Sequence, residues 1–82
     1  MIELVYFAWV RERIGAASEP YDGSAATVRD LVNELRAREP RYDLVFSDLT
    51  SLRVAIDQDL VDFDAPLTNA KEVAFFPPMT GG

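Results

Sequence analysis

Phe75-Phe76-Pro77-Pro78-Met79-Thr80-Gly81-Gly82 ends the sequence and determines how the rest of the chain is organised. The two aromatic residues end a predicted strand, because a proline has no N–H for a strand ladder and fixes its own φ. The two glycines have no side chains, so the segment after the prolines forms a thin thread that can enter a narrow channel. The only reactive group on such a thread is its α-carboxylate, which becomes an acyl donor only after activation. We therefore expect a protein whose own C-terminus is the reacting end.

The composition indicates one small globular domain that lacks a catalytic apparatus of its own. Its 82 residues are 49% hydrophobic and 27% charged, which are ordinary values for a folded domain. The net charge is −6, from 8 basic and 14 acidic residues, and it disfavours nucleic acid as a partner. The sequence has no His and no Cys, so it lacks disulfides, the usual neutral-pH base and the usual strong nucleophile.

No membrane or export segment is evident in the sequence. It has no run of about 18 apolar residues, as a spanning helix would need. Glu3 interrupts the apolar N-terminal stretch, and no small-residue cleavage site follows it. We therefore expect a cytoplasmic protein without a membrane partner.

Alternation in residues 2–10 predicts a strand with two largely apolar faces. One face carries Ile2, Leu4, Tyr6, Ala8 and Val10, and the other carries Glu3, Val5, Phe7 and Trp9. A sheet with one helix buries only one face, so we expect some or all of Val5, Phe7 and Trp9 to form an exposed apolar patch for a partner. The alternatives are a reversed register or a loop that covers these residues.

A charged turn and an edge strand are predicted next. Residues 11–15 form the turn, which Gly15 closes. Residues 18–21 form the strand, where Pro20 is tolerated only at the edge of a sheet. Together these segments predict an opening hairpin.

One main helix is predicted after Thr27, which suits an N-cap. Its buried stripe has the spacing i, i+3, i+4, i+7 and consists of Val28, Leu31, Val32 and Leu35. Pro40 ends the helix near residues 38–39. A short helical turn with Leu44, Val45, Phe46 and Leu49 is expected to close one end of the core.

Three further strands are predicted, over residues 52–57, 60–61 and 71–77. A tight turn at Gln58-Asp59 separates the first two, and Asn69 can adopt a left-handed turn conformation before the third. The order predicts an α+β fold, a mixed sheet of four to five strands with one main helix packed across it. The first and last strands would be parallel neighbours, although the order alone permits other α+β folds.

Four aspartates in residues 57–64 invite comparison with a calcium loop. They are Asp57, Asp59, Asp62 and Asp64. Such a loop needs a central glycine and a bidentate glutamate at its twelfth position, and the segment has neither. We expect a solvated hairpin and no metal site.

Particular residues along the whole chain carry a family resemblance. At the start stand Met1-Ile2, Phe7-Ala8, Val10-Arg11-Glu12 and Gly15; in the middle stand Gln58, Leu60-Val61, Phe63-Asp64 and Pro66-Leu67; at the end stand Glu72-Val73-Ala74-Phe75-Phe76-Pro77-Pro78 and Thr80-Gly81-Gly82. The chain resembles the MoaD-type sulfur carriers, the small subunits of molybdopterin synthase, which have a ubiquitin-like β-grasp fold. The resemblance implies a β-grasp domain over residues 1–77 and a flexible tail over residues 78–82.

The resemblance also implies a chemistry for the tail. An E1-like activating enzyme adenylates the Gly82 carboxylate with ATP, and a persulfide-bearing donor protein converts it to a thiocarboxylate. The tail then enters the active site of the large subunit in a heterotetramer, where the sulfur passes to a cyclic pyranopterin precursor to build the dithiolene. The small subunit itself binds no cofactor and is not an enzyme on its own.

The resemblance assigns roles to further residues. Gly81 keeps the tail thin, Thr80 belongs to the tail, and Pro77 and Pro78 stiffen its exit from the sheet. The docking positions for the large subunit are Phe7, Leu60 and Phe76, and Arg11 pairs with an acidic group of a partner.

Two alternatives remain at this point. The chain could be a sulfur carrier for thiamine synthesis or tRNA thiolation, although the Phe75-Phe76-Pro77-Pro78 block favours molybdopterin synthase. It could also be a β-grasp interaction module whose tail does not react.

Overall fold

The computed structural model describes residues 1–78 of the 82-residue chain. Within that range, five strands form one mixed sheet in the order β2-β1-β5-β3-β4, accompanied by three α-helices and one 3-10 turn. The elements are β1 (Ile2–Tyr6), α1 (Ala8–Ile14), β2 (Ser18–Tyr21), α2 (Val28–Arg38), α3 (Pro40–Phe46), η1 (Leu49–Ser51), β3 (Arg53–Ile56), β4 (Asp59–Val61) and β5 (Glu72–Phe76).

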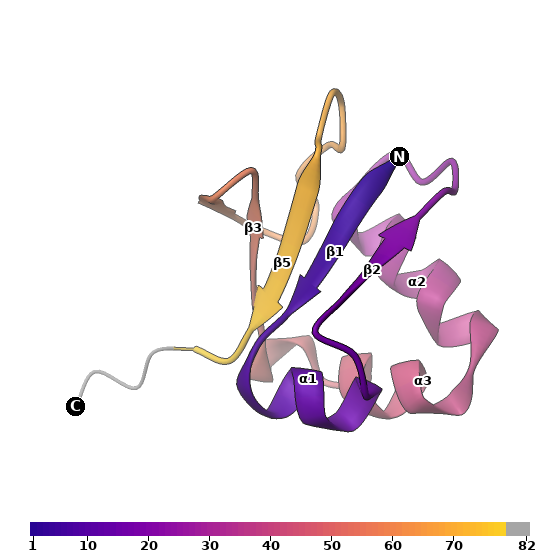
Figure 1. Cartoon of the computed structure of the whole chain (residues 1–82). Helices are drawn as coiled ribbons and strands as arrows, with labels where there is room; N and C mark the ends of the chain where they lie inside the picture. Colours follow the sequence, from indigo (N-terminus) through magenta and orange to yellow (C-terminus); the bar gives the residue numbers. More distant parts are fainter. Residues whose placement is uncertain (79–82) are drawn as a thin grey trace.

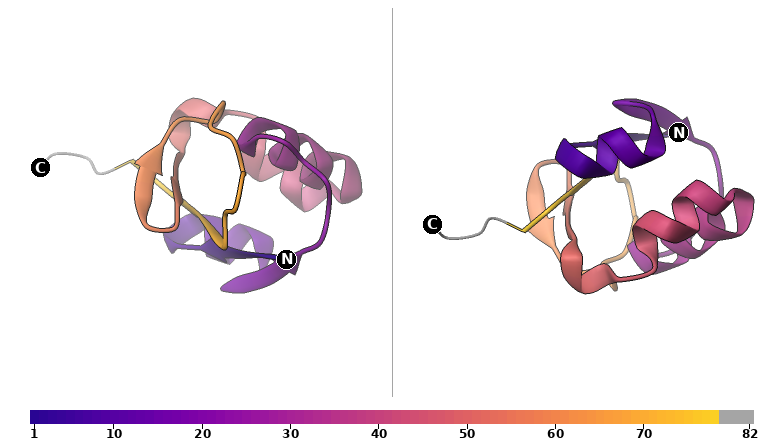
Figure 2. Two further views of the ribbon diagram at one scale, coloured as in Figure 1. Left: turned by 90° about the horizontal axis from the view of Figure 1, so that it is seen from above. Right: turned by 90° about the horizontal axis from the view of Figure 1, so that it is seen from below.

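The first and last strands lie side by side within the sheet. β1 and β5 pair in parallel, with Leu4 opposite Val73 and Tyr6 opposite Phe75. The other neighbouring strands pair antiparallel. Helices α2 and α3 lie on one side of the sheet, and α1 lies at the end where β1 stops (Figure 1, Figure 2). The predicted α+β fold is confirmed, with α1 and α3 as helices in addition to the main one.

The prediction of one strand over residues 2–10 is wrong beyond Tyr6. The chain turns at Ala8, whose φ is 52°, and α1 begins there. Val10 and Ile14 are four residues apart and both fully buried. Residues four apart share a face in either element, but they are about 6 Å apart along a helix and about 13 Å apart along a strand, so only the helix keeps Ile14 near Val10 in the core.

The charged turn predicted over residues 11–15 is also wrong, because most of it lies within α1. Gly15 still closes the segment, as expected, but it does so as the helix C-cap. Its φ of 89° is left-handed, and its N–H donates to the carbonyl oxygen of Arg11 at 2.8 Å.

Helix α2 packs its predicted stripe into the core. Its four apolar residues are fully buried: Val28, Leu31, Val32 and Leu35. The Thr27 side chain accepts a hydrogen bond from the backbone N–H of Asp30 at 3.2 Å, so the predicted N-cap is confirmed. The helix ends at Arg38, and Pro40 begins α3 because a proline fits the first turn of a new helix.

Helix α3 only partly matches the expected plug. Val45 and Phe46 are buried, but Leu44 is 73% exposed and does not belong to the core. Helix α3 buries one face, which carries Tyr42, Val45 and Phe46, and Leu44 lies on the opposite face, which is exposed to solvent.

The remaining strands begin and end within about two residues of the predicted bounds. Asp57 and Gln58 form the turn between β3 and β4, with φ values of 48° and 75°. Two positive φ values suit the turn type that matches strand twist. The turn therefore lies one residue earlier than predicted. Asn69 adopts the expected left-handed conformation, with φ 61°. Of the helices described, none is both long and apolar enough to cross a membrane.

Candidate functional site

The face of the sheet opposite the core carries a row of apolar residues. The register places Val5, Ala74, Ala55 and Leu60 next to one another across β1, β5, β3 and β4. Residues that pair directly across strands point to the same face. Ala74 and Ala55 are too small to project, whereas Leu60 is 67% exposed. The row is therefore flat in the middle and ends in a projecting leucine.

Phe7 and Phe76 extend this row at the end of the sheet where β5 stops. Phe75 is fully buried, so Phe76 points to the opposite, outer face, where it is half-buried. Phe7 has an extended backbone, donates its N–H to the carbonyl oxygen of Phe75 at 3.2 Å, and is 48% exposed. We call six residues the outer apolar strip: Val5, Phe7, Ala55, Leu60, Ala74 and Phe76. The three predicted docking residues thus lie on one face.

Trp9 does not belong to the outer apolar strip. It lies on α1, packs partly against the core, and has the Arg13 guanidinium 6.0 Å from its ring centroid. The expected apolar patch therefore includes Val5 and Phe7 but not Trp9, because the helix turns its side chain away.

Arg11 lies one helical turn after Phe7. Its backbone N–H reaches the carbonyl oxygen of Phe7 at 3.4 Å, and the residue is exposed. The ion pairs found within residues 1–78 use other arginines, namely Arg29, Arg36 and Arg41. The backbone of Arg11 therefore lies next to that of Phe7, and the residue is exposed.

Sequence reasoning missed Arg53 and Ala55 as parts of this face. Alternation in β3 already put both on the outer side, but only the strand register shows that Arg53 stands opposite Phe76. Arg53 and Leu60 also line an open hollow of about 550 Å³ at the β3–β4 edge. The rest of the lining consists of Leu49, Leu52, Val54, Val61, Asp62 and Phe63.

The chain leaves the sheet directly from the outer apolar strip. Pro77 and Pro78 follow Phe76, are half-buried, and lead away from α2 and α3 (Figure 1, Figure 2). Neither proline can extend the strand ladder, so the strand ends where it was expected to end. The predicted tail residues Thr80, Gly81 and Gly82 lie outside the described residues, and so does most of the predicted flexible segment 78–82.

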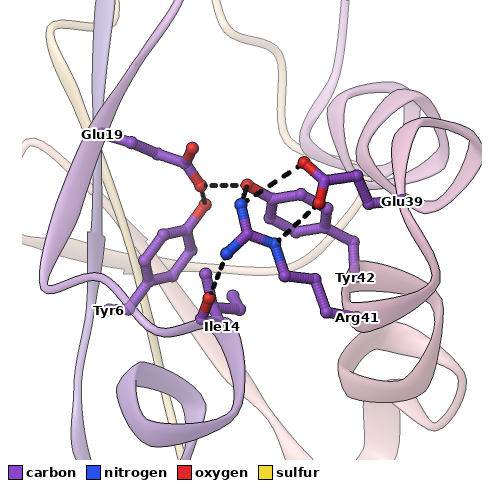
Figure 3. Close-up of polar contacts among 6 residues, drawn as sticks. All are labelled: Tyr6, Ile14, Glu19, Glu39, Arg41 and Tyr42. Carbon is purple, nitrogen blue, oxygen red and sulfur yellow. Dashed lines mark hydrogen bonds and ion pairs between the residues drawn. The ribbon is translucent and has the colours of Figure 1, made fainter.

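A polar network ties the end of β1 to α3 (Figure 3). The hydroxyls of Tyr6 and Tyr42 both donate to Oε2 of Glu19, at 2.7 and 2.6 Å. Arg41 lies 4.9 Å from the Tyr42 ring centroid and donates Nη1 to the carbonyl oxygen of Ile14, at the end of α1. The network joins β1, β2, α1 and α3, and so positions the residue that follows Tyr6, which is Phe7.

The surroundings of these tyrosines keep them protonated. Burial, together with the hydrogen bond to Glu19 and its charge, raises the pKa of Tyr42 to about 12. The same causes, burial first, raise the pKa of Tyr6 further. Burial and a hydrogen bond to Glu34 raise the pKa of Tyr21. At neutral pH the tyrosines are therefore donors that hold the scaffold together.

Three of the four aspartates in residues 57–64 make hydrogen bonds that stabilise local structure: Asp57, Asp62 and Asp64. Asp57 accepts hydrogen bonds from the backbone N–H groups of Lys71 and Glu72, at 3.1 and 2.9 Å. Asp64 pairs with Arg29 at 2.7 Å, which lowers the pKa of the Asp64 carboxyl. Within the part of the chain that the structure describes, no group of three or more carboxylates is arranged to hold a metal ion.

Comparison with known proteins agrees with this geometry. The ThiS family matches residues 4–82. The molybdopterin synthase sulfur carrier subunit of Escherichia coli is 43% identical over 82 residues, and the one of Haemophilus influenzae is 33% identical; each match covers 100% of both chains.

A solved structure extends the likeness to the fold. The crystal structure of SAMP1 from Haloferax volcanii has a TM-score of 0.77 and 26% identity, and the match covers 99% of this chain and 98% of that one. The chain belongs to the ThiS family and stands among its molybdopterin synthase sulfur carrier subunits.

Proposed function

We propose that this chain is the sulfur carrier subunit of a molybdopterin synthase and that Gly82 carries the transferable sulfur. The relatives that support this role match the chain from end to end. The structural observation that carries the proposal is the outer apolar strip, which runs to Phe76 and continues directly into Pro77-Pro78 and the tail.

The strip supplies the binding energy for a partner, and the tail supplies the reacting group. Phe7 and Leu60 are exposed and Val5 and Phe76 are half-buried, and apolar side chains gathered on one face of a small protein mark an interaction site. Four residues follow Pro78, so the carboxylate can lie at most about 14 Å beyond it when they are fully extended. We propose that the large subunit binds the strip around Phe7, Leu60 and Phe76, and takes the tail into its active site.

The chemistry happens on the carboxylate of Gly82 and uses groups from other proteins. An E1-like enzyme joins the carboxylate to the α-phosphorus of ATP, with loss of pyrophosphate. A persulfide-bearing donor displaces AMP, and a thiol then breaks the sulfur–sulfur bond to leave a thiocarboxylate on Gly82. This sulfur attacks the cyclic pyranopterin precursor in the large subunit. The small subunit binds no cofactor of its own in this scheme.

The residue types of the tail suit its insertion into a narrow channel. Gly81 has no Cβ, so a narrow channel accepts it, and a side chain there would block entry. Thr80 lies between the prolines and the glycine pair, inside the part that the partner encloses. Pro77 and Pro78 restrict the backbone where the tail leaves β5, which lowers the entropy lost when the tail is held.

Mass spectrometry tests the attachment point. The protein is incubated with ATP, the activating enzyme and the sulfur donor, and its intact mass is recorded. The expected result is the replacement of one oxygen by sulfur, located on Gly82 by fragmentation. A variant with one additional alanine after Gly82 is the control and should not react. An unmodified wild-type protein under conditions that load the Escherichia coli relative would refute the proposal.

The alternatives make different predictions in a co-purification experiment. A carrier for thiamine synthesis or tRNA thiolation would bind the enzymes of those routes rather than a molybdopterin synthase large subunit. An inert β-grasp module would bind a partner without forming an adenylate or a thiocarboxylate.

A further inference from the structure

Arg53 is an exposed cation on the docking face to which the proposed function gives no role. It pairs with Phe76 across β3 and β5, and it stands between Leu52 and Val54 in sequence, both fully buried. Its side chain therefore points to the outer face, beside the last strand residue before the tail. It also lines the hollow that Leu60 borders. Arg53 thus stands between the two ends of the outer apolar strip.

The contacts of the Arg53 guanidinium are hydrogen bonds to backbone carbonyl oxygens. Nη1 donates to the carbonyl oxygens of Leu52, at 2.8 Å, and Thr50, at 3.5 Å. No ion pair within residues 1–78 includes Arg53. The two carbonyl contacts hold the guanidinium in place but do not neutralise it, so an external carboxylate can still pair with it.

Charge is distributed unevenly along this face. Glu3 and Glu72 stand opposite each other on β1 and β5, at the end of the sheet far from the tail. Arg53 and Phe76 stand opposite each other at the tail end. In a chain with a net charge of −6, the end of this face far from the tail therefore carries Glu3 and Glu72, and the tail end carries Arg53, with Asp62 lining the same hollow.

We propose that Arg53 pairs with an acidic side chain of the large subunit, next to the channel that takes the tail, and so sets the orientation of docking. This inference rests on the proposed function, because it concerns the same face and the same partner. Apolar contact has no direction and permits several rotations of one surface on another. An ion pair near the tail favours the one rotation in which the tail meets its channel.

An acidic protein group suits Arg53 better than a phosphate. The net charge of the chain is −6, which repels a polyanion more strongly than it repels a single carboxylate. A single carboxylate can approach one guanidinium locally, and its contact with Arg53 is strengthened where the apolar strip excludes water.

Binding of the complete chain to the large subunit tests the inference, with Arg53→Glu as the variant and Arg38→Glu as its control. Both arginines are exposed and both changes lower the net charge equally, but Arg38 ends helix α2 on the other side of the sheet. We expect Arg53→Glu to weaken binding by about tenfold or more. The control should change it by less than about twofold, and Arg53→Lys should fall between wild type and Arg53→Glu because a lysine keeps only a point charge.

Salt and a third variant separate the possible outcomes. The loss caused by Arg53→Gln should shrink as the salt concentration rises, because salt screens exposed charges. Equal affinities for Arg53→Glu and Arg38→Glu would overturn the role of Arg53. Retention of full affinity by Phe76→Ala would instead overturn the docking face itself, and with it the proposed function.

Discussion

Leu60→Ala tests the docking face most cleanly, because Leu60 contributes little to the folded subunit alone. The residue is 67% exposed and lies on the three-residue edge strand β4. Removal of most of its side chain leaves the core intact. The change therefore acts mainly on association with the large subunit, where we propose that Leu60 becomes covered.

The expected loss of binding free energy follows from the exposed fraction of the Leu60 side chain. Complete burial of a leucine side chain is worth about 1.5–3 kcal/mol. About two thirds of that surface remains to be buried on docking, so the truncation should cost about 1–2 kcal/mol. The dissociation constant should therefore rise by about tenfold. Calorimetry of wild type and variant against the large subunit measures this change.

Leu44→Ala is the matched control for this experiment. Leu44 is 73% exposed, so the two leucines offer nearly the same apolar surface. Leu44 lies on α3, among the helices rather than on the outer face (Figure 1). Its truncation should change the dissociation constant by less than about twofold. Equal losses for both variants, or no loss for Leu60→Ala with an unchanged melting temperature, would refute the assignment of the docking face.

Three further predictions concern the scaffold. The pKa of Tyr42 is raised from 10.0 to about 12, so its protonated hydroxyl stabilises the fold fully below pH 10, and this contribution to the free energy of unfolding is lost as the pH rises through 12. Urea titrations followed by Trp9 fluorescence should therefore show that the free energy of unfolding falls less steeply with alkaline pH in Tyr42→Phe than in wild type. Equal slopes would contradict the network. Thr27→Ala should cost about 1 kcal/mol by removing the N-cap of α2, whereas the exposed Thr68→Ala should leave thermal stability unchanged. Gly15→Ala should cost about 1 kcal/mol through its left-handed φ, because its nearest contact at 3.7 Å leaves room for the methyl group, and a variant that melts with wild type would show that the cap relaxes.

The outer apolar strip was predicted in part because period-two alternation survives in β5. Phe75 and Phe76 had to point to opposite faces once the segment was a strand, and Phe75 is the buried one. The position of Arg53 was not predictable in the same way. Alternation gives its face, but its neighbour across the sheet depends on the pairing of β3 with β5, which joins segments far apart in sequence.

The sequence by itself determined the elements whose signals are local. The stripe of α2, its cap at Thr27, its end before Pro40 and the stop of β5 at Pro77 each depend on a few neighbouring residues. Charge and the lack of His and Cys also follow from the sequence alone. From the lack of His and Cys we predicted a chain without the usual neutral-pH base and strong nucleophile.

Only the tertiary structure decided the conformation after Tyr6. Alternation over residues 2–10 favoured a strand, although Phe7, Val10 and Ile14 also have the i, i+3, i+7 spacing of a helix face, so a short window does not choose between the two. The helical conformation is more stable because α1 buries Val10 and Ile14 in the core, and because Arg41 of α3 donates a hydrogen bond to the carbonyl oxygen of Ile14. Those contacts come from distant parts of the chain, and they leave Phe7 on the outer face while Trp9 lies on α1 and packs partly against the core.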